Sequence, residues 1–296
     1  MQTNEQIITR MAEDLKMRGY ASRTQTEYLR YARIFLNWAG KPAETMGEEN
    51  IRTYLMHLIN GKPLSASTIN LNNAALRFLF AVTLDRNLNY RQIPRLKQGS
   101  SISEILTKEE IVKLIDHASS LRDKAILMTI YGAGLRASEL CNLKAGDIDS
   151  GTMRIFIRSG KRGKDRYSLL SIDNLEILRD YWKAYRPNHT DRWLFLNSDG
   201  AKNIHYRTVQ HAFNSAVRDA GIAKQVTTHT LRACFATHLF EAGVDIFTIM
   251  RLLGHSSIQS TTAYLRLIKF SHTLISPLDT LPKKCDHKPK EVSANA

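Results

Sequence analysis

Four side chains near the C-terminal end of the sequence have the chemistry to bind and attack a phosphodiester: His229, Arg232, His255 and Tyr264. His229 and Arg232 are three positions apart, so a helix would place both on one face. We expect that helix to start near Thr228, whose hydroxyl is a suitable N-cap, and the free N–H groups there attract anions. This stretch therefore predicts a phosphate-binding site.

Cleavage of a phosphodiester builds up negative charge, and without a metal ion that charge must be met by fixed protein cations. Arginine suits this task because its guanidinium stays charged and offers a planar fork of donors. A tyrosine, with a pKa of about 10, attacks well only when neighbouring groups remove its proton or stabilise the phenolate. Histidine is suited to transfer that proton near neutral pH.

The order of these groups resembles a known family signature. An H-x-x-R motif is followed by L-L-G-H and by a tyrosine nine positions later, as in the tyrosine recombinases, also called the phage integrase family. The family's upstream arginine box resembles YGAGLRASEL, with Arg136, and its hairpin lysine resembles SGKRGKDR, with Lys161. The resemblance covers roughly residues 106–266. Ala233 is a departure, because the family usually has a histidine there.

The resemblance implies six catalytic residues: Arg136, Lys161, His229, Arg232, His255 and Tyr264. In that set the two arginines stabilise charge on the nonbridging oxygens, His229 is the general acid/base, and His255 hydrogen-bonds to the phosphate. Tyr264 is the nucleophile, and Lys161 protonates the departing 5′-oxygen.

Two neighbours of these residues leave alternatives open. Lys164, in the same turn as Lys161, is a candidate DNA contact, although both lysines could simply solvate a tight turn or hold phosphate as point charges. Glu139 lies three positions after Arg136, so it either orients that arginine or forms an ordinary helix ion pair.

By the same resemblance, the reaction is a transesterification that needs no ATP, metal or other cofactor. Tyr264 would form a 3′-phosphotyrosyl link, and two strand exchanges would pass through a Holliday junction during integration, excision, transposition or resolution. The implied partners are double-stranded DNA with inverted-repeat core sites and further copies of the chain, as a homotetramer on two duplexes. Residues 268–275 are apolar enough to pack on a neighbouring subunit. The alternatives are a type IB topoisomerase and a non-catalytic basic DNA-binding protein.

Composition favours the same class of partner. The 296 residues include 42 Lys and Arg and 28 Asp and Glu, a net charge of +14 that suits nucleic acid. The sequence has no apolar run long enough to span a membrane and no signal-peptide pattern, so we expect a cytoplasmic protein with no membrane partner. The three widely spaced cysteines predict neither disulfides nor a thiolate zinc site.

His229, His238 and His255 together could suggest a metal site. No H-E-x-x-H motif or carboxylate cluster accompanies them, so we expect no metal. His238 lies in an apolar run and is expected in the core with its hydrogen bond satisfied. Cys234, in the same run, is expected to be a packing residue rather than a nucleophile.

The predicted fold class is mainly α with a small β-sheet. The resemblance implies an N-terminal SAM-like helical bundle and a C-terminal tyrosine-recombinase catalytic domain. We place the helical DNA-binding domain at 1–93, a linker at 94–103, the catalytic domain at 104–277 and a mobile tail at 278–296.

In the first domain, apolar residues recur at three- and four-residue spacing, with breaks at 40–42 and 61–63. Ser22 and Ser65 are expected to start the second and fourth helices, and Tyr28, Tyr31 and Trp38 are expected in the core rather than stacked on bases.

The first domain is also expected to touch DNA. Residues 1–97 carry 14 basic and 8 acidic side chains, a net charge of +6. In the family this domain covers one face of the duplex and the catalytic domain the other, as a clamp. Four basic residues are candidates for the inner surface, with solvated charge as the equal alternative: Arg23, Lys62, Arg77 and Arg86.

In the second domain, Thr107 and Glu110 form a predicted capping box, and helices continue to about Asn142. Two strand-like runs, 153–159 and 165–172, flank the GKRGK turn and predict a hairpin. A further short strand is expected at 192–196. Helices are expected at 206–220, 229–242, 245–253 and 257–265.

Overall fold

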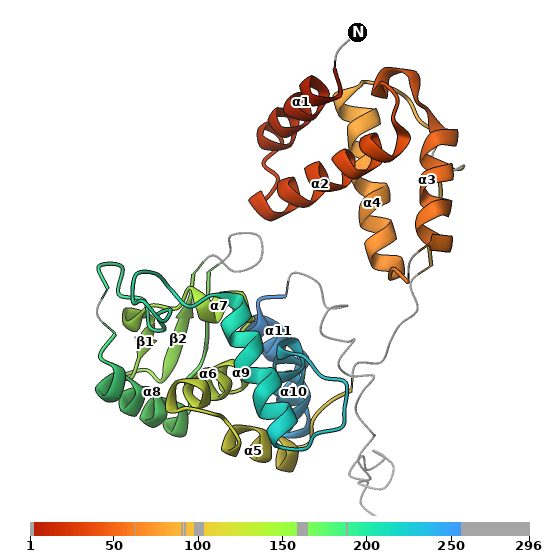
Figure 1. Ribbon diagram of the computed structural model, residues 1–296. Coiled ribbons are helices and arrows are strands. Elements are labelled where there is room, and N and C mark those ends of the chain that lie inside the picture. The colour runs from red at the N-terminus through yellow and green to blue at the C-terminus, as the bar shows by residue number, and fades with distance from the viewer. Residues whose placement is uncertain are drawn as a thin grey trace, which may run out of the picture. The chain divides into compact units, whose positions relative to one another are not determined.

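The structure is a computed structural model that describes residues 3–61, 63–89, 91, 93–97, 104–158, 165–187 and 189–255. The chain divides into two compact units, Met1–Ser101 and Ile102–Ala296 (Figure 1). Each unit has its own hydrophobic core. Several predictions fall outside the described residues: Lys62, Lys161, Lys164, Tyr264, the helix at 257–265, residues 268–275 and the tail.

The N-terminal unit is a helical bundle, as predicted. Its elements are α1 (Asn4–Met17), α2 (Ser22–Ala39), η1 (Ala43–Thr45), α3 (Glu48–Gly61), α4 (Ala66–Phe78) and η2 (Leu79–Thr83). Ser65 caps α4 by accepting a hydrogen bond from the Thr68 N–H at 3.2 Å, and α2 begins at Ser22 without a side-chain cap. Both predicted helix starts are confirmed.

The core prediction for the aromatic residues of α2 is only partly confirmed. Tyr31 is buried and Tyr28 is half-buried against the core. Trp38 is 40% exposed and stacks on His57, with ring centroids 5.6 Å apart. Its placement in the core was wrong, because it lies at the edge of the apolar face of α2, where Phe35, Tyr54 and His57 cover only part of the ring.

The start of the expected linker is held against α4. Asn70 and Leu96 exchange two hydrogen bonds, at 2.8 and 2.9 Å. The side-chain amide of Asn73 donates to the carbonyls of Ile93 and Pro94, each at 3.2 Å. Polar side chains of the helix thus satisfy the backbone of this extended segment. The finer domain bounds stay a prediction.

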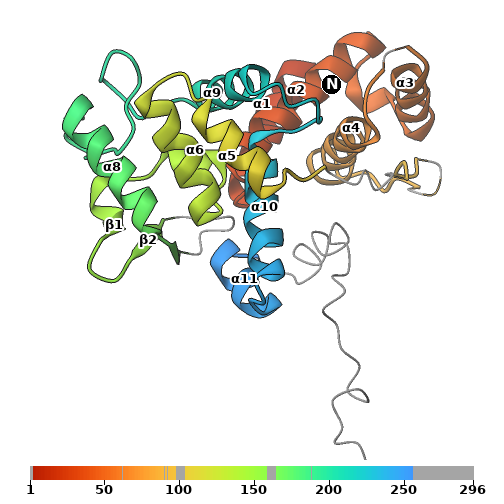
Figure 2. The same ribbon diagram turned by 90° about the horizontal axis from the view of Figure 1, so that it is seen from below.

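The C-terminal unit is mainly helical with a small sheet, which confirms the predicted fold class. Its elements are α5 (Lys108–Asp116), α6 (Leu121–Ala133), α7 (Ala137–Cys141), η3 (Ala145–Asp147), β1 (Ile148–Asp149), β2 (Arg154–Ile157), β3 (Arg166–Leu169), α8 (Ile172–Tyr185), α9 (Tyr206–Asp219), α10 (Thr228–Glu241) and α11 (Ile246–Leu253). Helix α6 runs through the middle of the unit, with the sheet and α8 on one side and α10 on the other (Figures 1 and 2). The capping box of Thr107 and Glu110 is confirmed at the start of α5.

The sheet is antiparallel, in the order β1-β2-β3, and β2 and β3 form the predicted hairpin. Ile155 pairs with Ser168 and Ile157 with Arg166, so these four side chains share the inner face. All four are buried. The hydroxyl of Ser168 donates to the Ala133 carbonyl at 2.7 Å, which fixes the hairpin on the end of α6.

Three local predictions were wrong. The second strand is predicted to run to 172, but β3 ends at Leu169 and the Ser171 hydroxyl caps α8, a helix that was not predicted from the sequence. The strand at 192–196 is reduced to single bridges, Lys144 with Trp193 and Leu196 with Asn203. The N-cap of α10 is Thr227 rather than Thr228, since the Thr227 backbone N–H donates to the Thr230 hydroxyl at 3.0 Å.

Within the part of the chain that the structure describes, no helix is both long and apolar enough to cross a membrane.

Candidate active site

The C-terminal unit holds a buried carboxylate that contacts three arginines. Glu139, on α7, accepts hydrogen bonds from Arg136, from Nη1 at 2.6 Å and from the backbone N–H at 2.9 Å. Arg166 donates from Nη1 and Nη2 to the two carboxylate oxygens, at 2.9 and 2.7 Å, in the bidentate geometry that arginine favours. Nη1 of Arg232 lies 3.5 Å from Oε2 of Glu139. We call these four residues the Glu139 cluster.

The Glu139 cluster carries net positive charge. Burial alone would raise the pKa of Glu139, but the hydrogen bonds and charge of Arg166, the Arg136 N–H and the charge of Arg232 lower it to about 2. The carboxylate is therefore ionised at neutral pH. Three guanidinium groups and one carboxylate leave the cluster with a charge of +2, which suits a phosphate ligand.

The end of α6 and the start of α7 position Arg136. Helix α6 ends at Gly134, which has a φ of +60°, and the chain turns directly into α7 with Arg136 as the N-cap residue. A Cβ at position 134 would lie 2.4 Å from Cδ1 of Phe235, so only glycine allows α10 to approach so closely. The Arg136 side chain is 22% exposed, whereas that of Glu139 is 6% exposed. Arg136 is thus the solvent-accessible side of the pair.

Arg232, in the first turns of α10, is completely buried. Its Nη1 donates to the Gly134 carbonyl at 2.6 Å, and its Nη2 donates to the Leu253 carbonyl at the end of α11. One guanidinium therefore ties together the C-terminal ends of α6 and α11, whose last carbonyls have no partner within their own helices. His229 lies one turn before Arg232 on α10 and is exposed over only part of its surface.

The positive charge of the Glu139 cluster helps to lower the pKa values of His229 and His255. Burial and the charges of Arg232, Arg136, Arg166 and His229 lower the pKa of His255 to about 4. Partial burial and the charges of Arg232 and Arg136 also lower the pKa of His229. Both imidazoles are therefore neutral at pH 7. A neutral imidazole can donate one hydrogen bond and accept another.

Helix α11 places His255 through its C-cap. Gly254 has a φ of +64°, which ends the helix, and the His255 N–H donates to the Met250 carbonyl at 3.1 Å. A Cβ at position 254 would lie 2.8 Å from Cδ of Arg166, so the glycine also allows that side chain to pass. The L-L-G-H motif is thus a helix end that packs on the Glu139 cluster.

The structure brings together four of the six residues expected from the sequence: Arg136, His229, Arg232 and His255. Lys161 and Tyr264 lie outside the described residues. Glu139 fits both descriptions proposed for it and goes beyond them, because it bridges arginines from three elements. Arg166 was missed. The sequence did hold a sign of its role. Arg166 alternates with Ser168 and Leu170, which are buried, and a charged residue on a buried face needs a partner there.

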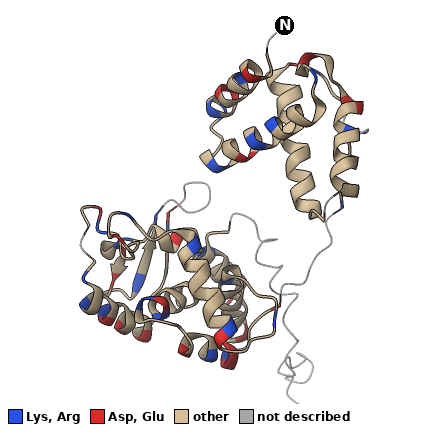
Figure 3. Cartoon of the chain, in the orientation of Figure 1, with Lys and Arg blue, Asp and Glu red and all other residues tan. Residues whose placement is uncertain are grey.

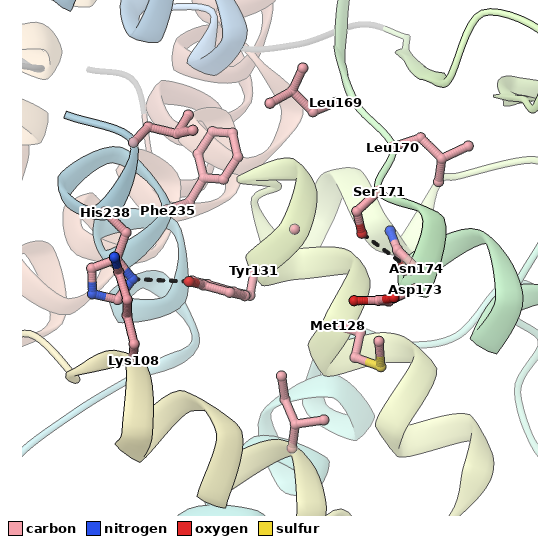
Figure 4. A pocket seen from close by; sticks show the side chains of 13 residues that line it. Lys108, Met128, Tyr131, Leu169, Leu170, Ser171, Asp173, Asn174, Phe235 and His238 are labelled. Atoms are coloured by element: carbon pink, nitrogen blue, oxygen red, sulfur yellow. Dashed lines mark hydrogen bonds between the residues drawn. The ribbon is translucent and has the colours of Figure 1, made fainter. Parts of the chain in front are cut away.

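His238 takes part in a separate contact, as expected for a core histidine. It is buried, and its Nδ1 lies 3.0 Å from the Tyr131 hydroxyl (Figure 4). The two residues line a pocket of about 580 Å³ between α5, α6, α8 and α10, which no member of the Glu139 cluster reaches. Among the residues that the structure describes, no group of His, Cys, Asp or Glu side chains is arranged to hold a metal ion.

The two described cysteines are packing residues, which confirms the prediction for Cys234. Cys141 and Cys234 are free and buried. Burial raises the pKa of Cys234 to about 11, so its thiol stays protonated at neutral pH.

Basic residues lie on both units (Figure 3). Of the candidates in the N-terminal unit, Arg23 is exposed. Arg77 donates to Asn73 at 3.0 Å and to the Ile93 carbonyl at 2.5 Å, and Arg86 donates to the carbonyls of Glu44 and Met46. Arg77 and Arg86 thus have intramolecular roles, and their contact with DNA stays a prediction.

Comparison with known proteins gives the site its context. Residues 104–269 match the phage integrase family, and residues 7–90 match the phage integrase N-terminal SAM-like domain. The chain is 40% identical over 295 residues to y4qK of Sinorhizobium fredii, a candidate integrase/recombinase by name, covering 97% of this chain and 94% of the relative. It is 33% identical to the tyrosine recombinase XerA of Thermococcus kodakarensis, over 90% and 93% of the two chains.

The chain belongs to the phage integrase family. It is a tyrosine-type site-specific recombinase that acts on DNA, with a SAM-like N-terminal domain and an integrase catalytic domain. A crystal structure of XerA recombinase is 29% identical, with a TM-score of 0.52, over 88% of this chain and 93% of that one. A XerH recombinase bound to a palindromic difH substrate shares the fold, with a TM-score of 0.69 at 21% identity over 82% and 76%.

Proposed function

We propose that this recombinase cleaves and rejoins DNA strands by transesterification, with Tyr264 as the nucleophile and a 3′-phosphotyrosyl intermediate. The observation that carries the proposal is the Glu139 cluster, where Arg136 and Arg232 converge beside two neutral histidines. A fixed site with a charge of +2 is suited to a phosphodiester that gains negative charge in the transition state.

Each side chain has a distinct task in this proposal. Arg136, which is partly exposed, contacts the nonbridging oxygens, and Arg232 adds charge from the buried side. Neutral His229 takes the proton of the tyrosine, and His255 donates a hydrogen bond to the phosphate.

As the bond between Tyr264 and phosphorus forms and the bond to the 5′-oxygen breaks, Lys161 protonates that departing oxygen. Because one phosphodiester replaces another, the phosphotyrosyl bond keeps the energy of the broken bond. A 5′-hydroxyl from a second duplex attacks that bond and restores the DNA backbone without ATP. Two such exchanges pass through a Holliday junction.

The proposed assembly is a homotetramer on two inverted-repeat core sites. Support comes from relatives, since the XerH structure holds a palindromic substrate and a lambda integrase structure is a dimer bound to a core site. The net charge of +14 favours DNA as the partner of this chain too.

The decisive test replaces Tyr264 by phenylalanine, which removes only the attacking oxygen. On a nicked core-site duplex the parent protein should form a covalent adduct that survives a denaturing gel, and Tyr264→Phe should form none while binding the duplex with nearly unchanged affinity. An adduct that persists in the variant would place the nucleophile at another residue.

A further inference from the structure

Arg166 is the member of the Glu139 cluster for which the reaction assigns no task. It lies on β3, opposite Ile157, on the inner face of the hairpin, and its side chain is 7% exposed. Nη1 and Nη2 contact the two oxygens of Glu139, and Nε donates to the Leu252 carbonyl at 2.8 Å. Every nitrogen of the guanidinium is thus engaged inside the protein, which leaves this arginine poorly placed to contact DNA.

The net charge of the Glu139 cluster indicates what Arg166 contributes. Glu139 orients Arg136 through two hydrogen bonds, but its negative charge would also oppose a phosphate held by that arginine. Without Arg166 the cluster would carry two positive charges and one negative charge, a net +1. With Arg166 the net charge is +2, because one guanidinium offsets the carboxylate.

Arg166 also contacts the element that presents His255. It donates to the carbonyl of Leu252, and its Cδ fills the space beside Gly254, where a Cβ would be only 2.8 Å away. Arg166 therefore joins β3, α7 and the end of α11. These are the elements that carry the lysine hairpin, the first arginine and the second histidine of the motif.

We propose that Arg166 is a positioning residue that neutralises Glu139, so that Glu139 can orient Arg136 without reducing the positive charge offered to the scissile phosphate. This inference rests on the proposed function, since it concerns the same phosphate. It assigns to Arg166 an effect on the charge of the site in addition to any effect on folding.

The test compares three variants in single-turnover formation of the covalent adduct, at saturating protein and well below the unfolding temperature. Arg166→Gln leaves a net cluster charge of +1 and should react about 100-fold more slowly than the parent protein. Adding Glu139→Gln returns the charge to +2 and should recover at least about tenfold of that rate. Arg166→Lys keeps the charge but loses the bidentate contact, and should lie between the parent and Arg166→Gln.

A second substrate separates charge from folding. A methylphosphonate at the scissile position carries no charge, so it needs less positive charge from the protein. The loss caused by Arg166→Gln should therefore shrink by about tenfold or more on this substrate. A variant that reacts slowly only because it is partly unfolded would lose the same factor on both substrates.

The control is Arg218→Gln, which removes an exposed ion pair with Asp219 on α9 and should match the parent protein on both substrates. Equal losses on the two substrates, no recovery in the double variant, or a parental rate for Arg166→Gln would each overturn the inference. Failure of the proposed function is seen separately, as absence of a Tyr264-dependent adduct in the parent protein.

Discussion

At the scale of single residues, the protonation state of His255 follows from its neighbours. Partial burial, followed by the charges of three arginines, disfavours the imidazolium and lowers the pKa of His255 to about 4. The side chain is thus neutral at pH 7 before DNA binds. A phosphate in the site would bring negative charge near the ring and raise its pKa, so DNA binding and protonation of His255 should favour each other.

The lowered pKa of His255 predicts a pH-dependent stability. Between pH 6.5 and about 4 the unfolded chain binds a proton at this histidine and the folded chain does not, so the free energy of unfolding falls as the pH falls. With its partial exposure taken into account, this contribution is on the order of 2 kcal/mol. Chemical denaturation of the parent and of His255→Gln should show it.

The comparison isolates one group, because other acid-sensitive groups are common to both proteins. The stability of the parent relative to His255→Gln should decrease between pH 6.5 and 4, and change little below pH 4. A difference that stays constant over this range would show that His255 titrates normally in the folded chain.

The residues that the sequence could reveal are those whose roles depend on local spacing. Arg136 and Glu139 are three positions apart, and so are His229 and Arg232. The contact of Arg166 with Glu139 spans 27 positions and that of Arg232 with Gly134 spans 98, and no local periodicity encodes such pairs. The family signature identified Arg232, but Arg166 had only the strand alternation to distinguish it.

At the scale of elements, the end of α11 combines two demands on Gly254. Its φ is +64°, and a Cβ would meet Arg166. Gly221 is a matched control, since its φ is +63° and a Cβ there would meet nothing within 4 Å. Gly221→Ala should lower stability by about 1 kcal/mol through backbone strain alone. Gly254→Ala should cost at least about 1 kcal/mol more, since Arg166 must move.

The two alanine variants should also differ in activity. Gly254→Ala should form the covalent adduct more slowly, because it displaces Arg166 and the chain that carries His255, whereas Gly221→Ala should react like the parent. Thermal unfolding and adduct formation measure the two effects. Equal stability losses in both variants would show that the contact with Arg166 imposes no constraint.

The role proposed for Lys161, between β2 and β3, can be tested with two substrates that differ in their leaving group. If Lys161 protonates the departing 5′-oxygen, Lys161→Ala should cleave ordinary DNA about 100-fold more slowly. A 5′-bridging phosphorothiolate has a sulfur leaving group, whose conjugate acid has a pKa of about 8.5, so it needs little protonation. Lys161→Ala should therefore cleave that substrate almost as fast as the parent.

Two other variants show whether rescue by the sulfur leaving group is specific to Lys161. Lys164→Ala should show little of this selective rescue, and Arg136→Ala should stay slow on both substrates because its charge acts on the nonbridging oxygens. Rescue of Lys164→Ala in place of Lys161→Ala would move the acid by three positions along the turn.

Two helix starts could be predicted from a capping hydroxyl, whereas the start of α8 was missed although Ser171 caps it. The cap at Ser65 and the box of Thr107 and Glu110 were found because a hydroxyl must satisfy free N–H groups at a helix start. Helix α8 was missed because its cap, Ser171, and its first residue, Ile172, closely follow the apolar end of β3. The strand was therefore predicted to continue to 172. The spacing of the buried residues of α8, Asn174, Leu178 and Tyr181, was the available signal.

At the scale of the whole molecule, positive charge is shared between the two units. Residues 1–97 carry +6 of the total net charge of +14. Because each phosphate contact releases counterions, affinity for DNA depends on how many cations reach the backbone, whichever unit carries them. The chemistry, by contrast, is assigned to residues of the C-terminal unit alone.

This division predicts that binding and cleavage can be separated. A fragment of residues 104–296 keeps the Glu139 cluster and Tyr264 but loses the basic N-terminal unit. Its affinity for core-site DNA should fall at least about tenfold, and the salt dependence of binding should become shallower by about 0.9 in log–log slope for each lost phosphate contact. At saturating concentration it should still form the covalent adduct on nicked DNA at a rate near that of the full chain. Titration over a range of salt concentrations, with Tyr264→Phe in both backgrounds as the non-reacting control, measures the two properties separately. Unchanged affinity and an unchanged salt slope in the fragment would mean that the N-terminal unit makes no phosphate contacts, and the proposal of a DNA clamp formed by both units would then be wrong.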